Sequence, residues 1–222
     1  TVTAALDGGA RFIGFMFFDK SPRDVAPETA ARLAGPIRAK GGVGATAVTV
    51  DPSDALLERL AATLRPDFIQ LHGKETPARA REVGERTGAE VIKVIPVAEA
   101  ADIDKAAAFE TVVAHLMFEG KPPRDADRPG GIGARFDWTL LSGRRFNRPW
   151  FLAGGLDPWN VAEAARLSMA IGDMAGWRRV PRSPMDVPGS PGTGEPLLMP
   201  VAPAVPSRRA ERSSAMDGAP VT

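Results

Sequence analysis

Short apolar runs alternate with helical patterns along most of the chain, and this alternation constrains the fold more than any other feature. The runs favour strands and recur at intervals of roughly 25 residues. Strands that alternate with helices form parallel sheets, because each helix returns the chain to the start of the next strand. The sequence therefore predicts an α/β fold with six parallel strands, over residues 12–17, 45–50, 68–72, 91–97, 115–118 and 150–156.

Helix-capping residues support the helices of this pattern. Thr76 followed by Pro77 predicts a helix start, and Gly88 suits the end of the same helix. Asp157 and Pro158 repeat the signal before a helix over 161–167. Two further starts are predicted at Ser53–Asp54, before leucines at helical spacing, and at Asp137, before Trp138, Leu140 and Leu141.

Both ends of the chain depart from the alternation. Residues 1–6 read as a helix with no strand before it, so we expect the chain to begin inside a strand–helix unit. Residues 170–222 hold nine of the 21 prolines and one aromatic residue, Trp177. Such a segment buries too little apolar surface to offset its chain entropy. We expect a folded domain over 1–169 and a Pro-rich, disordered tail over 170–222.

Composition narrows the functional classes. The 28 basic and 27 acidic residues give a net charge of +1, which disfavours a nucleic-acid-binding protein. The 222 residues contain no cysteine, which excludes a disulfide framework, a thiolate metal site and a cysteine nucleophile among them. The sequence contains no apolar run of about 18 residues, so it predicts no membrane-spanning helix. With no recognisable signal peptide, we expect a cytoplasmic protein.

Candidate functional residues follow the strands, where parallel α/β folds gather their chemistry. Lys20 and Arg23 follow the first strand and can hold an anion. His72 ends the third strand and Glu119 the fifth, where a partly desolvated carboxyl group can act as a general acid or base. His115 begins its strand, at the opposite edge, and is predicted to be structural.

Two glycine-rich segments lie at the same edge of the predicted sheet. Residues 130–133, which include Gly131, form a predicted loop that either covers a substrate or merely connects elements. Gly154 and Gly155 precede a helix start, where backbone N–H groups can approach a phosphate. With Arg23 and Glu119 at that edge, the pattern predicts a phosphorylated small-molecule substrate.

Four segments in this order resemble the phosphoribosylanthranilate isomerases of tryptophan biosynthesis. They are residues 14–23, 70–73, 130–138 and 152–161, and the resemblance extends over 1–168. The resemblance implies a (β/α)8 TIM barrel, of which the six strand–helix units here would be the second to the seventh. Domain 1–169 is then an incomplete barrel that lacks the first and eighth strands.

The resemblance also implies a reaction and a set of site residues. The family rearranges N-(5'-phosphoribosyl)anthranilate without cofactor or metal. A general acid protonates the furanose ring oxygen, and a general base then removes the C2′ proton. The acid is an Asp in the family and Glu119 here, whereas the base is a cysteine that has no counterpart in this sequence. The remaining matches are substrate-binding Arg23, which takes the anthranilate carboxylate, His72 and Gly131, and phosphate-binding Gly154 and Gly155.

Two other interpretations remain open at this point. Without the base and without the second half of the phosphate site, these 222 residues are expected to turn over substrate barely above background. The chain would then be an inactive truncated or frameshifted fragment of the family. Another phosphate-binding barrel, such as an indole-glycerol-phosphate synthase, is the other candidate, although the motifs at 20–23 and 70–73 argue against it.

Overall fold

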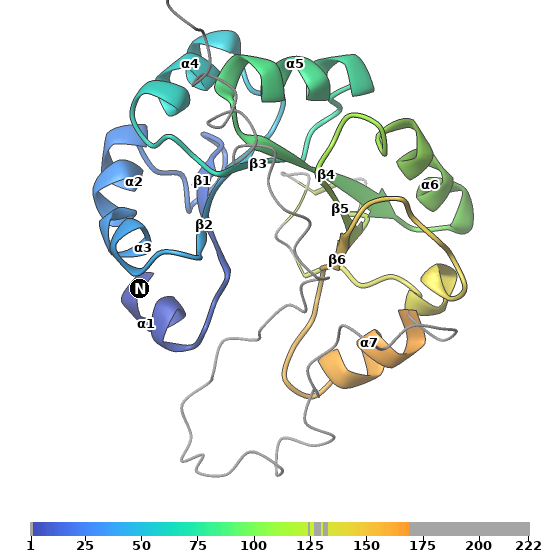
Figure 1. The fold of residues 1–222 in the computed structure, drawn as a ribbon. Coiled ribbons are helices and arrows are strands. Elements are labelled where there is room, and N and C mark those ends of the chain that lie inside the picture. The colour runs from blue at the N-terminus through green and yellow to red at the C-terminus, as the bar shows by residue number, and fades with distance from the viewer. Residues whose placement is uncertain (1, 124, 127–129, 131–132, 169–222) are drawn as a thin grey trace, which may run out of the picture.

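A computed structural model describes residues 2–123, 125–126, 130 and 133–168. Within them, six strands form one sheet in the order β1-β2-β3-β4-β5-β6, and all five neighbouring pairs are parallel (Figure 1). This confirms the predicted strand number and direction. The proposed tail, 170–222, lies outside the described residues. The strands are β1 (Phe12–Phe17), β2 (Gly44–Thr49), β3 (Phe68–Leu71), β4 (Glu90–Val97), β5 (His115–Gly120) and β6 (Trp150–Leu152).

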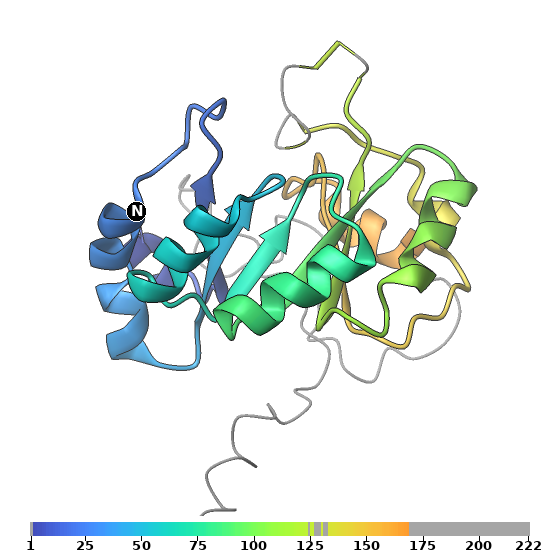
Figure 2. The ribbon, with the colours of Figure 1, turned by 90° about the horizontal axis from the view of Figure 1, so that it is seen from above.

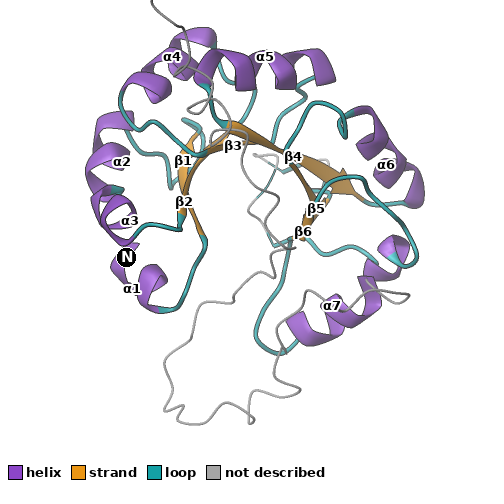
Figure 3. Ribbon diagram, viewed as in Figure 1, coloured by secondary structure: helices purple, strands orange, loops and turns teal. Residues whose placement is uncertain are grey.

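The sheet curls into a half-barrel, and the helices cover its convex face (Figure 3). Figure 2 shows that the strands run in one direction, with the helices packed along one face of the sheet. All strand carboxyl ends therefore lie at one rim. The helices and 3-10 turns are α1 (Val2–Asp7), α2 (Pro27–Leu33), α3 (Gly35–Lys40), α4 (Asp54–Ala62), α5 (Pro77–Thr87), α6 (Ala100–Asp104), η1 (Lys105–Ala108), η2 (Trp138–Leu141) and α7 (Val161–Ser168).

Alternate side chains of the strands enter two separate apolar clusters, as a period of two requires. The larger cluster fills the space between the sheet and the helices and includes Leu57, Val83 and Phe118. The smaller one includes Ile92 and Phe151, and it lies on the other face of the strands.

His115 belongs to an aromatic group at the amino ends of the strands. Its ring stacks on Phe151 with centroids 5.3 Å apart, and it also contacts Phe12 and Phe68 edge-on. These contacts agree with the structural role expected for His115.

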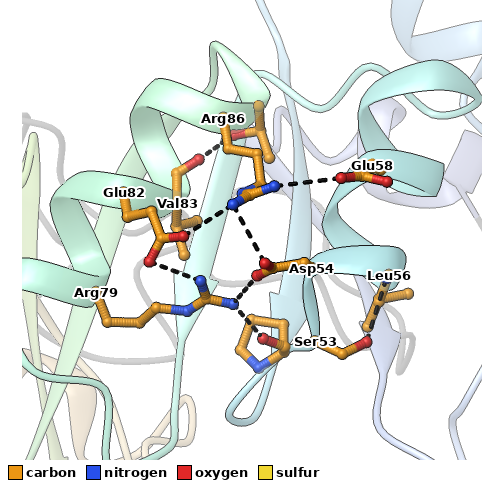
Figure 4. A network of polar contacts seen from close by, with 10 residues as sticks. Ser53, Asp54, Leu56, Glu58, Arg79, Glu82, Val83 and Arg86 are labelled. Atoms are coloured by element: carbon orange, nitrogen blue, oxygen red, sulfur yellow. Dashed lines mark hydrogen bonds and ion pairs between the residues drawn. The ribbon is translucent and has the colours of Figure 1, made fainter.

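The predicted capping residues act as the sequence indicated. Thr76 Oγ1 accepts a hydrogen bond from the Arg79 N–H at 3.2 Å, and Gly88 ends α5 in the left-handed conformation with φ +69°. Ser53 caps α4 in the same way. The outer surfaces of α4 and α5 are joined by ion pairs, in which Arg86 contacts acidic side chains of both helices (Figure 4).

Two predicted elements are shorter than expected. The strand predicted over 150–156 ends at Leu152, because Gly154 and Gly155 take φ values of +87° and +64°, which a strand does not accommodate. The helix predicted after Asp137 is a single 3-10 turn, η2, followed at once by Gly143 with φ +72°. Asp157 accepts from the N–H groups of Trp159 and Asn160 in a turn that precedes α7.

Replacing Thr76 with alanine should destabilise the domain by about 1 kcal/mol, because the Arg79 N–H loses its capping acceptor. Chemical denaturation of the two proteins measures this difference. Thr76→Ser is the control, since it retains a hydroxyl oxygen and should stay close to the unmodified chain. An alanine variant as stable as the serine variant would contradict the capping role.

Candidate active site

A cavity of about 490 Å³ opens at the carboxyl ends of the strands. Three of the residues singled out in the sequence line it, namely Arg23, His72 and Glu119. They come from the loop after β1, the end of β3 and the end of β5, so the parallel register brings them to one place. Gln70 also lines it, and the remaining lining residues are apolar or small and include Met16, Val48, Met117, Gly130 and Ala153.

Glu119 and His72 face each other inside this cavity. Glu119 Oε2 lies 3.5 Å from His72 Nδ1, and the two side chains are only 13% and 12% exposed. Gly130 packs against both, since a Cβ at this position would lie 2.9 Å from Glu119 Oε2 and 2.9 Å from His72 Nδ1. A side chain larger than hydrogen at residue 130 would therefore collide with the pair.

His72 is neutral at physiological pH. Burial, together with a smaller effect of the positive charge of nearby Lys93, lowers its pKa to about 4. The contact with Glu119 is thus between a neutral imidazole and a carboxyl group, although its distance would also suit an ion pair. The neutral imidazole is favoured because water is largely excluded from the ring.

Gln70, two residues before His72 on β3, contacts the His72 ring through its side-chain amide, Nε2 to Nε2. This contact is compatible with the tautomer that carries its hydrogen on Nδ1, the nitrogen that faces Glu119. In the sequence, Gln70 belongs to the motif 70–73 but has no predicted role. Its position two residues before His72, on the same strand face, was the available signal.

Arg23 is held at the rim of the cavity by its own loop. Its N–H donates to Ser21 Oγ at 3.2 Å, and Asp24 Oδ1 accepts from the Phe18 N–H at 2.8 Å. These bonds close the loop after β1 and leave the Arg23 side chain exposed. Among the described residues no carboxylate forms an ion pair with Arg23, so its guanidinium is available to an anion.

Gly154 and Gly155 form a tight turn next to Glu119. A Cβ on Gly154 would lie 2.6 Å from Ala134 O and 3.2 Å from Glu119 Cγ, and one on Gly155 would lie 2.6 Å from Gly133 O. Only glycine fits this crowded backbone at positive φ. Gly131, the other predicted glycine of the site, lies outside the described residues.

Arg135 fixes the glycine turn and was not identified from the sequence. Its Nε donates to Gly155 O at 2.9 Å, and its Nη2 contacts Asp157 Oδ2 at 2.8 Å. Its place in segment 130–138, one of the four segments that resemble the family, was the available sequence signal.

Comparison with known proteins identifies the family. The model of the family described as N-(5'-phosphoribosyl)anthranilate (PRA) isomerase matches residues 1–176. The chain belongs to the phosphoribosylanthranilate isomerase family. The N-(5'-phosphoribosyl)anthranilate isomerase of Caulobacter vibrioides is 63% identical over 168 residues, which are 76% of this chain and 76% of the relative. That of Paracoccus denitrificans is 50% identical over 171 residues, covering 77% and 79%.

Solved structures of the phosphoribosylanthranilate isomerase family share the fold. The enzyme of Thermotoga maritima matches with a TM-score of 0.64 and 30% identity, over 75% of this chain and 77% of that one. A phosphoribosylanthranilate isomerase in complex with reduced 1-(o-carboxyphenylamino)-1-deoxyribulose 5-phosphate matches with a TM-score of 0.60 and 26% identity, over 75% of both chains. These relatives confirm an isomerase of tryptophan biosynthesis and favour it over the inactive-fragment interpretation.

No helix in the described part of the chain has the length and apolar character that a membrane crossing needs. The predicted cytoplasmic location is compatible with this finding and stays a prediction. The same holds for the expectation that the reaction needs neither cofactor nor metal.

Acidification should destabilise the fold through His72. Because its pKa is about 4 in the folded state and 6.5 ordinarily, the unfolded chain binds more protons between these values. Stability is then full above pH 6.5 and falls toward pH 4, by on the order of 3 kcal/mol for this ring. Denaturation of the chain and of His72→Asn across this range measures the contribution.

The His72→Asn variant should show a weaker pH dependence between pH 6.5 and 4. It should not lose the dependence altogether, because burial also lowers the pKa of His115. An identical pH dependence in both proteins would contradict a buried, neutral His72.

Proposed function

We propose that Glu119 is the general acid of the family's reaction in this chain. The observation that carries this proposal is the position of Glu119, which faces His72 in a cavity that Arg23 also lines. In an Amadori rearrangement, a proton is delivered to the furanose ring oxygen while the bond between that oxygen and C1′ breaks. A carboxyl group that is only 13% exposed and lies inside the cavity is placed to act as a general acid toward a bound substrate.

We also propose how the substrate, N-(5'-phosphoribosyl)anthranilate, lies in the cavity. The guanidinium of Arg23 binds the anthranilate carboxylate, because its fork matches a carboxylate and no described carboxylate occupies it. The backbone N–H groups around Gly154 and Gly155 take the phosphate. Glu119 lies beside this turn, so the sugar would reach it while both charged ends are held.

Two further residues are proposed to assist the reaction, one beside Glu119 and one beside the substrate. His72 presents its Nδ1–H toward Glu119, which stabilises the carboxylate once its proton has left. Gly131, which follows the cavity-lining Gly130 in the sequence, is proposed to contact the substrate. The base that removes the C2′ proton is a cysteine in the family and is not assigned to any of these residues.

We propose, finally, that the half-barrel is part of an eight-stranded TIM barrel. Within the described residues, β1 pairs with no strand other than β2, and β6 pairs with no strand other than β5. In a closed barrel such edges pair with further strands. The relatives are matched over about three quarters of their own length, which is compatible with this proposal.

The substrate-binding roles can be tested with the compound named for the related complex, reduced 1-(o-carboxyphenylamino)-1-deoxyribulose 5-phosphate. Calorimetric titration of the chain should show saturable binding. Arg23→Gln should weaken that binding by roughly tenfold or more, because a charge-assisted contact contributes about 1.5–3 kcal/mol. Arg86→Gln, on the outer face of α5, is the matched control and should leave the affinity unchanged. Equal affinities of the unmodified and Arg23→Gln chains would contradict the carboxylate site.

The acid role and the closed barrel can be tested together in cells. A chimera would join domain 1–169 of this chain to the parts of the Caulobacter vibrioides relative that the alignment leaves out. It should restore growth without tryptophan to a strain that lacks the isomerase. Glu119→Gln in the chimera should reduce turnover on the order of 10²-fold or more, because the ring oxygen loses its proton donor. Growth and turnover that are indifferent to Glu119→Gln would contradict the acid assignment.

A further inference from the structure

A buried ion pair lies near the cavity, but neither of its two residues lines the cavity. Lys93 Nζ lies 2.6 Å from Glu75 Oε2, and the two side chains are only 5% and 1% exposed. Lys93 projects from β4 toward the helix side, over the Phe109 ring, while its neighbours Ile92 and Val94 face the opposite way into the smaller cluster. Removing a charge pair from water costs free energy, and only good geometry and additional hydrogen bonds offset that cost.

The pair holds the backbone on both sides of His72. Lys93 Nζ donates to Gly73 O at 2.8 Å and to Leu71 O at 3.4 Å. Glu75 Oε1 accepts from the Gly73 N–H at 3.0 Å. The residues before and after His72 are thus bound to the same two buried charges.

The pair also ties this loop to the loop of the neighbouring strand. Glu75 Oε1 accepts from the Asp51 N–H at 2.9 Å, and Asp51 Oδ1 accepts in turn from the Lys74 N–H at 2.7 Å. Asp51 has a φ of +44°, an unfavourable conformation for a residue with a side chain. Gly73 packs so closely that a Cβ there would lie 2.4 Å from Asp51 Cγ.

We propose that Lys93 and Glu75 are positioning residues of the active site, which fix the strand-end loop so that the His72 ring meets Glu119. The proposal deepens the function proposed above, since it concerns the same site. Neither residue lines the cavity, so both act through the backbone of residues 71–73. Among the described residues, the charged groups that face this region include Lys93 and Glu75 behind the ring, Glu119 in front of it, and Asp51 beside Gly73.

The test is the pKa of His72 in Glu75→Gln, measured by nuclear magnetic resonance of its ring nitrogens. If Glu75 positions the loop, the variant loosens residues 71–73, admits water to the ring and raises the pKa from about 4 toward 6.5. If Glu75 acts only by partly neutralising Lys93, the positive charge of Lys93 is no longer compensated in the variant and lowers the pKa of His72 instead. A lowered or unchanged pKa would overturn the proposal.

Asp67→Asn is the matched control. Asp67 directly precedes β3, at the end opposite to the loop that carries His72 and Glu75. Its carboxylate pairs with Arg38 at 3.1 Å and accepts a hydrogen bond from the Ala45 N–H at 2.9 Å. This variant also removes a paired, amide-binding carboxylate, yet it should leave the pKa of His72 at its original value. A shift equal to that of Glu75→Gln would show a general loss of stability, and would overturn the proposal.

A measurement on the unmodified chain covers the case in which Glu75→Gln does not fold. The amide hydrogens of Asp51 and Gly73, bound by buried Glu75, should exchange as slowly as those inside β3 and β4. Exchange as fast as in exposed loops would mean that the buried pair does not hold this backbone. Both readouts are independent of substrate binding, so a failure of the proposed function would not be mistaken for a failure of this proposal.

Discussion

Parallel pairing of six consecutive strands is the constraint on which the rest of the structure depends. Because every strand runs the same way, all carboxyl ends meet at one rim, and residues distant in the sequence become neighbours there. Because side chains alternate along each strand, His72 and Glu119 face the cavity while Lys93 faces the helices. The curl of the sheet then brings the first and fifth strand ends around one hollow of about 490 Å³.

Exclusion of water gives this site its electrostatic character. The imidazole of His72 is neutral because it is buried, and its Nδ1 faces the Glu119 carboxyl group. Behind the ring, the charges of Lys93 and Glu75 are buried only because each satisfies the other and the backbone around them. At the rim, by contrast, Arg23 stays exposed to solvent, as suits a group that must capture an anion.

Much of this arrangement was predictable from local chemistry. Apolar periodicity located the six strands, and Thr76, Pro77 and Gly88 marked the ends of α5 because capping depends on a few adjacent atoms. The strand-end rule singled out His72 and Glu119, since both directly follow buried runs. The contact between them was not predictable, because it requires the register and curl of three strands.

Other features were missed because they depend on partners far along the chain. Lys93 interrupts the apolar run 91–95, which signals an unusual buried cation, but nothing in the sequence pairs it with Glu75 in another loop. The early end of β6 was missed because the paired glycines were read as a continuation of the strand. The crowding by Ala134 and Gly133 that makes positive φ necessary there is a tertiary contact.

The most direct test of the account is a crystal structure of the chain with reduced 1-(o-carboxyphenylamino)-1-deoxyribulose 5-phosphate. The account predicts that the carboxylate of the compound contacts the Arg23 guanidinium and that its phosphate lies on the backbone N–H groups around Gly154 and Gly155. The sugar-derived carbons should then pass within reach of Glu119. A compound bound in the reverse direction, or outside the cavity that His72 and Glu119 line, would contradict it.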